Sequence, residues 1–162
     1  MLDAVSESKA PAGSQPTRSS AQTRRVAAID IGTNSTHLLV ASVDTTLGTF
    51  SIEQAEKSTT RLGERDPDSG ELTSAGMQRG YETLRRFRDL AISHDVEQIV
   101  TAATSAVREA PNGREFLQSI QDGLGMDVDL VSGPEEARLI YLGVLSGMSF
   151  GDRPHLLLDI GG

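Results

Sequence analysis

The stretch Val26-Ala-Ala-Ile-Asp-Ile-Gly-Thr-Asn-Ser-Thr-His-Leu-Leu-Val-Ala-Ser-Val43 decides the fold. Val26 to Ile31 is an almost unbroken apolar run of strand length. Thr36 to Val43 is a second run, and both of its faces are largely apolar, which is typical of a strand covered on both sides. The sequence therefore predicts two neighbouring strands joined by a short polar turn.

The turn itself is Asp30-Ile-Gly-Thr-Asn-Ser35. Glycine permits positive φ and close backbone approach, and amides and hydroxyls supply donors, so Gly32, Thr33, Asn34 and Ser35 suit a bound phosphate. The carboxylate of Asp30 suits a metal ion or a positioned water better than a bare phosphate. On this stretch alone, a polar β-hairpin whose Asp and Gly serve turn geometry is the more ordinary interpretation.

Composition narrows the classes of protein. The chain has 162 residues with 37% hydrophobic residues, enough for one domain with a core. It has no cysteine, which excludes thiolate chemistry and disulfides. No apolar run approaches the roughly 20 residues that span a bilayer, and no secretory signal is evident, so we expect a cytoplasmic protein. The net charge of −8 argues against non-specific nucleic-acid binding.

The remaining segments predict an α/β fold with a mixed sheet, in which a three-strand meander precedes alternating helices and strands. Residues 1–25 have the composition of a disordered tail. The further elements are expected as strands at 50–60, 96–101, 127–131 and 155–160, and as helices at about 73–94, 114–123 and 134–147. We interpret 26–150 as one lobe and 151–162 as the first strand of a second lobe that the chain does not complete.

The last predicted strand repeats the first motif. Leu156-Leu-Leu-Asp-Ile-Gly-Gly162 parallels the segment that contains Asp30. Two such motifs, about one lobe apart, indicate paired phosphate loops across a cleft, with Asp159, Gly161 and Gly162 in the second loop. Chance similarity between two buried strands is the alternative.

Two acids open the predicted helix at 134–147, in Ser-Gly-Pro-Glu135-Glu136-Ala-Arg. A helix dipole stabilises acids in the first turn, which explains either residue structurally. An apolar stripe from Ala137 to Met148 is expected to be buried. Glu136 lies about 110° from the centre of that stripe and Glu135 about 150°, so Glu136 is the better candidate for a rigidly held carboxylate.

Arg108 follows a predicted strand end, in Thr101-Ala-Ala-Thr-Ser-Ala-Val-Arg. Strand ends of α/β sheets bind ligands, and an arginine can bind phosphate through two donors. A surface pair with Glu109 is the ordinary alternative. The three histidines show no metal-ligand spacing, and His37 is interpreted as a strand residue.

Taken together, the four motifs around Asp30, Arg108, Glu136 and Asp159 resemble the exopolyphosphatase / guanosine pentaphosphate phosphatase (Ppx/GppA) family. The resemblance implies an actin-like (ribonuclease H-like) ATPase-superfamily lobe. It implies that Glu136 deprotonates the attacking water and that Asp159, with Asp30, holds Mg²⁺ or another divalent cation. It also implies phosphate binding by the residues of both loops and by Arg108, namely Gly32, Thr33, Asn34, Ser35, Arg108, Gly161 and Gly162.

The resulting hypothesis is an exopolyphosphatase that removes the terminal phosphate of inorganic polyphosphate, of which this chain is an N-terminal fragment and is silent by itself. Hydrolysis of pppGpp by the same motifs is the near alternative. A sugar or acetate kinase is more distant, and a non-catalytic phosphate-binding module is the alternative from another class. A homodimer is left open as the assembly of the full-length protein.

Overall fold

The computed structural model describes residues 23–151 and 154–159. Its centre is a five-stranded sheet in the order β3-β2-β1-β4-β5. The strands are β1 (Thr23–Ile31), β2 (Ser35–Asp44), β3 (Thr49–Thr59), β4 (Gln98–Ala103) and β5 (Asp129–Leu130). β1, β2 and β3 form the predicted antiparallel meander, while β4 pairs parallel with β1 and β5 parallel with β4. The mixed α/β sheet expected from the sequence is therefore confirmed.

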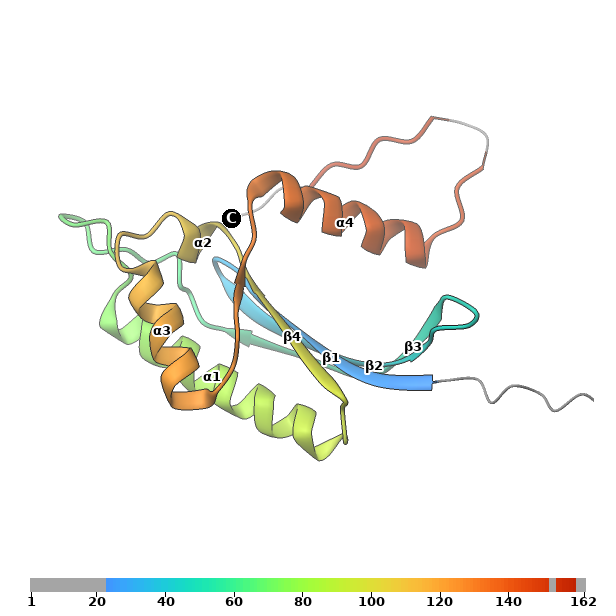
Figure 1. Cartoon of the computed structure of the whole chain (residues 1–162). Coiled ribbons are helices and arrows are strands. Elements are labelled where there is room, and N and C mark those ends of the chain that lie inside the picture. Colours follow the sequence, from blue (N-terminus) through green and yellow to red (C-terminus); the bar gives the residue numbers. More distant parts are fainter. Residues whose placement is uncertain (1–22, 152–153, 160–162) are drawn as a thin grey trace, which may run out of the picture.

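Two helices cover one face of this sheet, α1 (Ser74–Ser93) and α3 (Gly113–Leu124) (Figure 1). Between them runs the short α2 (Ser105–Arg108). Thr73 caps α1, since its hydroxyl accepts a hydrogen bond from the Gly76 amide at 3.1 Å. Phe87 of α1 and Phe116 of α3 are buried on this side with the inward residues of the sheet, among them Ile29, Ile31, Leu38 and Val40. Each such side chain contributes about 1.5–3 kcal/mol of burial free energy.

The opposite face of the sheet lies beneath α4 (Gly133–Gly147), the helix that carries Glu136 (Figure 1). None of its residues is buried. A cavity of about 540 Å³ separates Leu139 of α4 from the sheet residues Ala28, Leu39 and Val100. The prediction that β2 is covered on both faces holds in part: in its second apolar row Ala41 is buried and Leu39 and Val43 are half-buried, whereas Ala28 and Val100 of the neighbouring strands are exposed.

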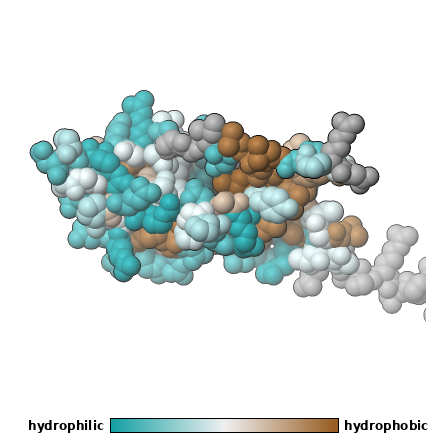
Figure 2. All heavy atoms as spheres, turned by 90° about the horizontal axis from the view of Figure 1, so that it is seen from above, coloured by the Kyte–Doolittle hydropathy of each residue, from teal (hydrophilic) through white to brown (hydrophobic). Residues whose placement is uncertain are grey.

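The prediction that the apolar stripe of α4 is buried was wrong. Tyr141, Leu145 and Met148 are among the exposed large apolar residues, at 53%, 42% and 61%. Seen from above, apolar side chains gather at the middle of this face of the molecule (Figure 2). Helical periodicity predicts which side of a helix is apolar, but it does not state how closely a neighbour approaches.

Both ends of the predicted lobe need correction. Thr23, Arg24 and Arg25 belong to β1 rather than to a tail. Arg25 is held there because its guanidinium donates to the carbonyl of His94 at 2.9 Å, beyond the end of α1. The predicted tail over residues 1–22 lies outside the described residues.

The predicted strand at 155–160 does not form over the described residues 155–159. Leu156 and Leu158 are 91% and 75% exposed there. A strand needs a hydrogen-bonded neighbour, and residues 154–159 pair with no strand of the part that the structure describes. In that part of the chain, no helix has the length and apolar character that a bilayer crossing requires.

Candidate active site

The turn between β1 and β2 is pinned to the loop that follows β3. The amides of Thr60 and Arg61 donate to the Asn34 carbonyl at 3.1 and 3.0 Å, and the Gly63 amide donates to the Thr33 carbonyl at 2.8 Å. These bonds satisfy the outward carbonyls of the turn and fix its path. The turn is therefore a rigid part of the sheet edge rather than a free hairpin loop.

Gly32 is required by close approach and not by its own φ angle. Its amide donates to the Ser35 carbonyl at 3.1 Å. A Cβ at Gly32 would lie 2.9 Å from that same carbonyl oxygen. The sequence offered positive φ and close approach as reasons for this glycine, and the second reason applies. At Gly63 a Cβ would meet a side chain instead, since it would lie 2.4 Å from the Cγ2 of Thr33, which would have to turn away.

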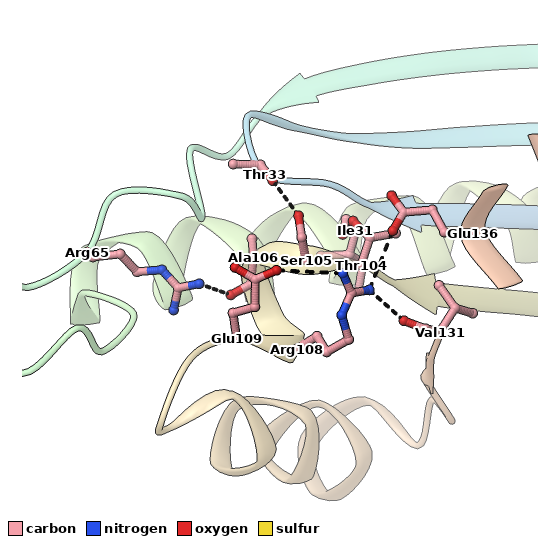
Figure 3. A network of polar contacts seen from close by, with 10 residues as sticks. All are labelled: Ile31, Thr33, Arg65, Thr104, Ser105, Ala106, Arg108, Glu109, Val131 and Glu136. Atoms are coloured by element: carbon pink, nitrogen blue, oxygen red, sulfur yellow. Dashed lines mark hydrogen bonds and ion pairs between the residues drawn. The ribbon is translucent and has the colours of Figure 1, made fainter. Parts of the chain in front are cut away.

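The turn meets α2, which begins just beyond the end of β4. The hydroxyls of Thr33 and Ser105 lie 3.2 Å apart and share a hydrogen bond (Figure 3). Thr104 continues the pairing of β4 with β1, since its amide donates to the Ile31 carbonyl at 3.3 Å. Parallel strands end at the same edge of a sheet, so the two motifs that the sequence singled out separately come together there.

A cleft of about 950 Å³ opens at this edge. The turn between β1 and β2, α2 and α4 each contribute residues to its lining. They include the predicted site residues Asp30, Gly32, Thr33, Asn34, Ser35, Glu136 and Asp159. Gly161 and Gly162 lie outside the described residues. The structure thus brings together the predicted residues that it describes, with one exception, Arg108.

Arg108 does not line the cleft, and its guanidinium is already engaged (Figure 3). Nη1 donates to the Val131 carbonyl at 2.7 Å and lies 3.4 Å from Oε2 of Glu136. Nη2 lies 3.6 Å from Oε1 of Glu109. The surface pair with Glu109, weighed as the ordinary alternative, is therefore present together with a second pair. In this structure Arg108 positions the helix that carries Glu136.

Glu136 and Glu135 have different partners. The Glu136 side chain is 31% exposed, pairs with Arg108 and lines the cleft. Glu135 forms a two-bond contact with Arg138, one turn further along α4, at 2.8 Å for each bond. This pairing lowers the pKa of Glu135. The helix itself begins at Gly133, with Ser132 as its cap.

Asp30, near the end of β1, lines the cleft. Partial loss of hydration raises the pKa of its carboxyl group above the ordinary value of 3.8. His37 opposes this rise in pKa and Glu136 adds to it. The negative charge of Glu136, on α4, is thus a minor cause of the raised pKa of Asp30, on β1.

His37 and Lys57 extend a row that begins at Asp30. In the sheet, Asp30 pairs with His37 and His37 pairs with Lys57, and all three side chains line the cleft. His37 Nε2 also lies 2.8 Å from the Ser35 hydroxyl. His37 was interpreted as an ordinary strand residue, but its place in the cleft follows from strand register, which the predicted meander could have suggested.

Other cleft residues were missed in the sequence. Ser105, Arg65 and Glu109 line the cleft. Ser105 is part of the quoted Thr-Ser-Ala-Val-Arg motif, so the motif contained its signal. Arg65 lies in a loop with no periodicity, and nothing in the sequence ties it to the cleft.

The carboxylates of the cleft supply part of the ligand set of a divalent cation. Within residues 23–151 and 154–159, no group of three or more His, Cys, Asp or Glu side chains is arranged to hold a metal ion. Asp30, Glu136 and Asp159 nevertheless line one cleft. Mg²⁺ is usually bound by one or two carboxylates together with water and substrate phosphates. The donor set therefore fits a cation shared with a substrate, and it does not form a complete protein cage.

The sheet order, the helices on both faces and the cleft at the strand ends define one lobe of an actin-like α/β fold. A profile of the Ppx/GppA phosphatase family matches residues 39–162. The chain belongs to this family.

Solved structures agree with this assignment. A Ppx/GppA family member from Aquifex aeolicus is 31% identical with a TM-score of 0.71, over 76% of this chain and 40% of that one. An exopolyphosphatase from Cytophaga hutchinsonii is 33% identical with a TM-score of 0.69, over 75% and 38%. An exopolyphosphatase-like protein is 31% identical with a TM-score of 0.74, over 83% and 40%. The chain thus spans about 40% of the length of the solved relatives that it matches.

Proposed function

We propose that the cleft binds the terminal phosphates of inorganic polyphosphate and that the complete protein is an exopolyphosphatase. The observation that carries this proposal is the meeting of Glu136 with the hydroxyl-rich turn in one cleft. A carboxylate that can accept a proton and hydroxyls that can donate to phosphate oxygens come from distant segments of the chain. The similarity to the Cytophaga exopolyphosphatase supports the same substrate class.

In the proposed reaction, the hydroxyls of Thr33, Ser35 and Ser105 donate to oxygens of the terminal phosphate. A water oxygen attacks the phosphorus, and the P–O bond to the next phosphate breaks. Glu136 accepts the proton that the water loses. Asp30 and Asp159 would hold Mg²⁺, which neutralises charge on the phosphates when bound. Catalysis of this kind relies on positioning and charge neutralisation.

The lining of the cleft bears on the choice between polyphosphate and pppGpp. Its apolar residues in the described part of the chain are Ala106 and Ile140, and the described lining contains no Phe, Tyr or Trp. Stacking on His37 or Arg65, which also line the cleft, is the means by which it would hold the guanine base of pppGpp. The described lining offers hydroxyls, carboxylates and cations, a composition that suits a repeating phosphate chain.

Release of phosphate from long-chain polyphosphate, pppGpp and ATP tests the proposal on a protein of the length of the solved relatives. Polyphosphate should be hydrolysed fastest, and Glu136→Gln should abolish most of that release. Preferential hydrolysis of pppGpp would assign the alternative activity. Binding without release by the longer protein would mean a phosphate-binding module. The 162-residue chain alone should release little or no phosphate.

The metal proposal has a test that does not depend on turnover. A ligand that binds only the folded state raises the melting temperature. Mg²⁺ with pyrophosphate should therefore raise the melting temperature of the wild-type chain more than that of Asp30→Asn. Asp129→Asn, on β5 and outside the cleft lining, serves as the charge-matched control and should respond like wild type. Equal responses of the three proteins would remove Asp30 from the metal site.

A further inference from the structure

We propose that Arg65 is the arginine of this lobe that binds substrate phosphate, in the role that the sequence gave to Arg108. This inference rests on the proposed function of the cleft as a phosphate site. Arg65 lies in the loop between β3 and α1, and its side chain lines the cleft together with Thr33, Ser35 and Ser105.

The position of Arg65 follows from the way its loop is held. The Gly63 amide donates to the Thr33 carbonyl at 2.8 Å, and a Cβ at Gly63 would lie 2.4 Å from the Cγ2 of Thr33. The loop is therefore fastened to the phosphate-binding turn two residues before Arg65. From there, Nη2 of Arg65 donates to the carbonyl of Ala106 (Figure 3). Ala106 directly follows Ser105, whose hydroxyl contacts Thr33.

The guanidinium of Arg65 uses only some of its N–H donors in the described hydrogen bonds. Its described hydrogen bonds are those to the carbonyls of Ala106 and Gly70, from Nη2 and Nη1. A guanidinium carries five N–H donors. Both acceptors are neutral carbonyls, and within residues 23–151 and 154–159 no carboxylate lies within ion-pair distance of Arg65. Its charge is therefore available to an anion that enters the cleft.

Arg108 differs from Arg65 in each of these respects. It is paired with Glu136 at 3.4 Å and Glu109 at 3.6 Å, and it does not line the cleft. Phosphate binding by Arg108 would require it to leave the carboxylate that it positions. Binding of phosphate by Arg65 breaks no ion pair. The neutral carbonyl of Ala106 holds the guanidinium beside the hydroxyls, and the positive charge stays unpaired.

The ligand class that fits is a phosphate chain of two or more phosphates. Arg65 and Lys57 both line the cleft, and they come from the loop after β3 and from β3 itself. The hydroxyls of the turn and of Ser105 receive the terminal phosphate. Arg65 then binds it or the adjoining phosphate through paired N–H···O bonds, the geometry for which a guanidinium is suited.

Titration calorimetry of the chain with inorganic tripolyphosphate tests the assignment. Arg65→Gln removes the charge but keeps an amide that can donate to Ala106, so binding should weaken by roughly ten- to hundredfold, the loss expected for a charged hydrogen bond. Arg65→Lys keeps the charge and should recover part of the affinity. Arg61→Gln is the matched control, since Arg61 belongs to the same loop, is exposed and does not line the cleft; its affinity should stay within about twofold of wild type.

Three outcomes would overturn the assignment. Wild-type affinity in Arg65→Gln, with a large loss in Arg108→Gln, would return the role to Arg108 and leave the proposed phosphate site intact. Equal losses of affinity and of melting temperature in Arg65→Gln and Arg65→Lys would mean that Arg65 only tethers the loop to α2. No binding of tripolyphosphate by the wild-type chain would overturn the proposed phosphate site itself, and this assignment with it.

Discussion

Arg108 ties Glu136 to the end of the parallel sheet. Its Nη1 atom lies 3.4 Å from Oε2 of Glu136 and donates to the carbonyl of Val131 at 2.7 Å. Val131 in turn donates its amide to the Ala103 carbonyl at 3.0 Å, at the end of β4. Since no residue of α4 is buried, these polar contacts at its first turn fix its position where hydrophobic packing does not.

Loss of this contact should loosen α4 selectively. Arg108→Gln removes one charged hydrogen bond, worth about 1.5 kcal/mol, so the amides of α4 should exchange roughly tenfold faster by hydrogen exchange. The amides of α1, packed in the core, should keep their wild-type rates. Arg138→Gln breaks the exposed pair with Glu135 on the same helix and should change exchange much less. Similar acceleration in both variants would show that the position of α4 does not depend on Arg108.

Close approach at Gly32 predicts a local cost for a single methyl group. Gly32→Ala places a Cβ 2.9 Å from the backbone oxygen of Ser35, and the turn must shift to relieve it. We expect a loss of about 1–3 kcal/mol in the free energy of unfolding, as for overpacking elsewhere. Gly143→Ala is the control, because it lies inside α4 with open space around it; alanine there should be neutral or stabilise by up to about 1 kcal/mol. Urea denaturation of both variants measures the difference.

Asp30 and Asp66 should affect stability with opposite signs as pH changes. The pKa of Asp30 is raised, mainly by lost hydration, so its contribution to stability is present below the unfolded value near 3.8 and is lost as pH rises through the folded pKa. Asp30→Asn should therefore be more stable than wild type at pH 7, and the gain should vanish in acid.

The pKa of Asp66 is lowered, first by the backbone N–H of Ser69 and then by that of Asp68. Its contribution to stability is present above the unfolded pKa and is lost as pH falls through the folded pKa. Asp66→Asn should therefore be less stable than wild type at pH 7, and this difference should also close in acid. Thermal unfolding of both variants between pH 3 and pH 7 compares them. Parallel behaviour of the two variants would contradict the opposite shifts.

The sequence predicted best where a local pattern has one structural solution. The meander over residues 26–60 and the helices at α1 and α3 follow from strand-length apolar runs, helical spacing and a cap at Thr73. Prediction from the sequence failed where burial or strand pairing depends on a neighbouring element. No residue of the predicted apolar stripe on α4 is buried, and residues 155–159 are apolar enough for a strand but have no partner strand among the described residues.

The candidate site divides in the same way. Asp30, Glu136 and the turn residues stand in recognisable motifs, and the structure places them in one cleft. Arg108 also stands in a motif, but an arginine between two carboxylates pairs with them, and a motif does not reveal such competition. Arg65 has no motif at all. Its place depends on the contact between Gly63 and Thr33, which joins segments that only the folded sheet brings together.

The two adjacent acids of α4 offer the sharpest test of the proposed catalytic base, in a protein of the length of the solved relatives. Glutamine at 136 preserves size but cannot accept the proton of water, so Glu136→Gln should lower kcat by roughly 10²–10⁴-fold and leave KM nearly unchanged. Glu135→Gln removes the same charge one residue away, where the carboxylate contacts Arg138 and lies outside the cleft lining. Its kcat should change by less than about threefold, since only a weak dipole interaction and an exposed ion pair are lost. Because both variants lose one negative charge from the same helical turn, a general electrostatic effect would lower both rates alike. Equal losses, or a larger loss at Glu135, would show that the helix presents a different carboxylate to the substrate.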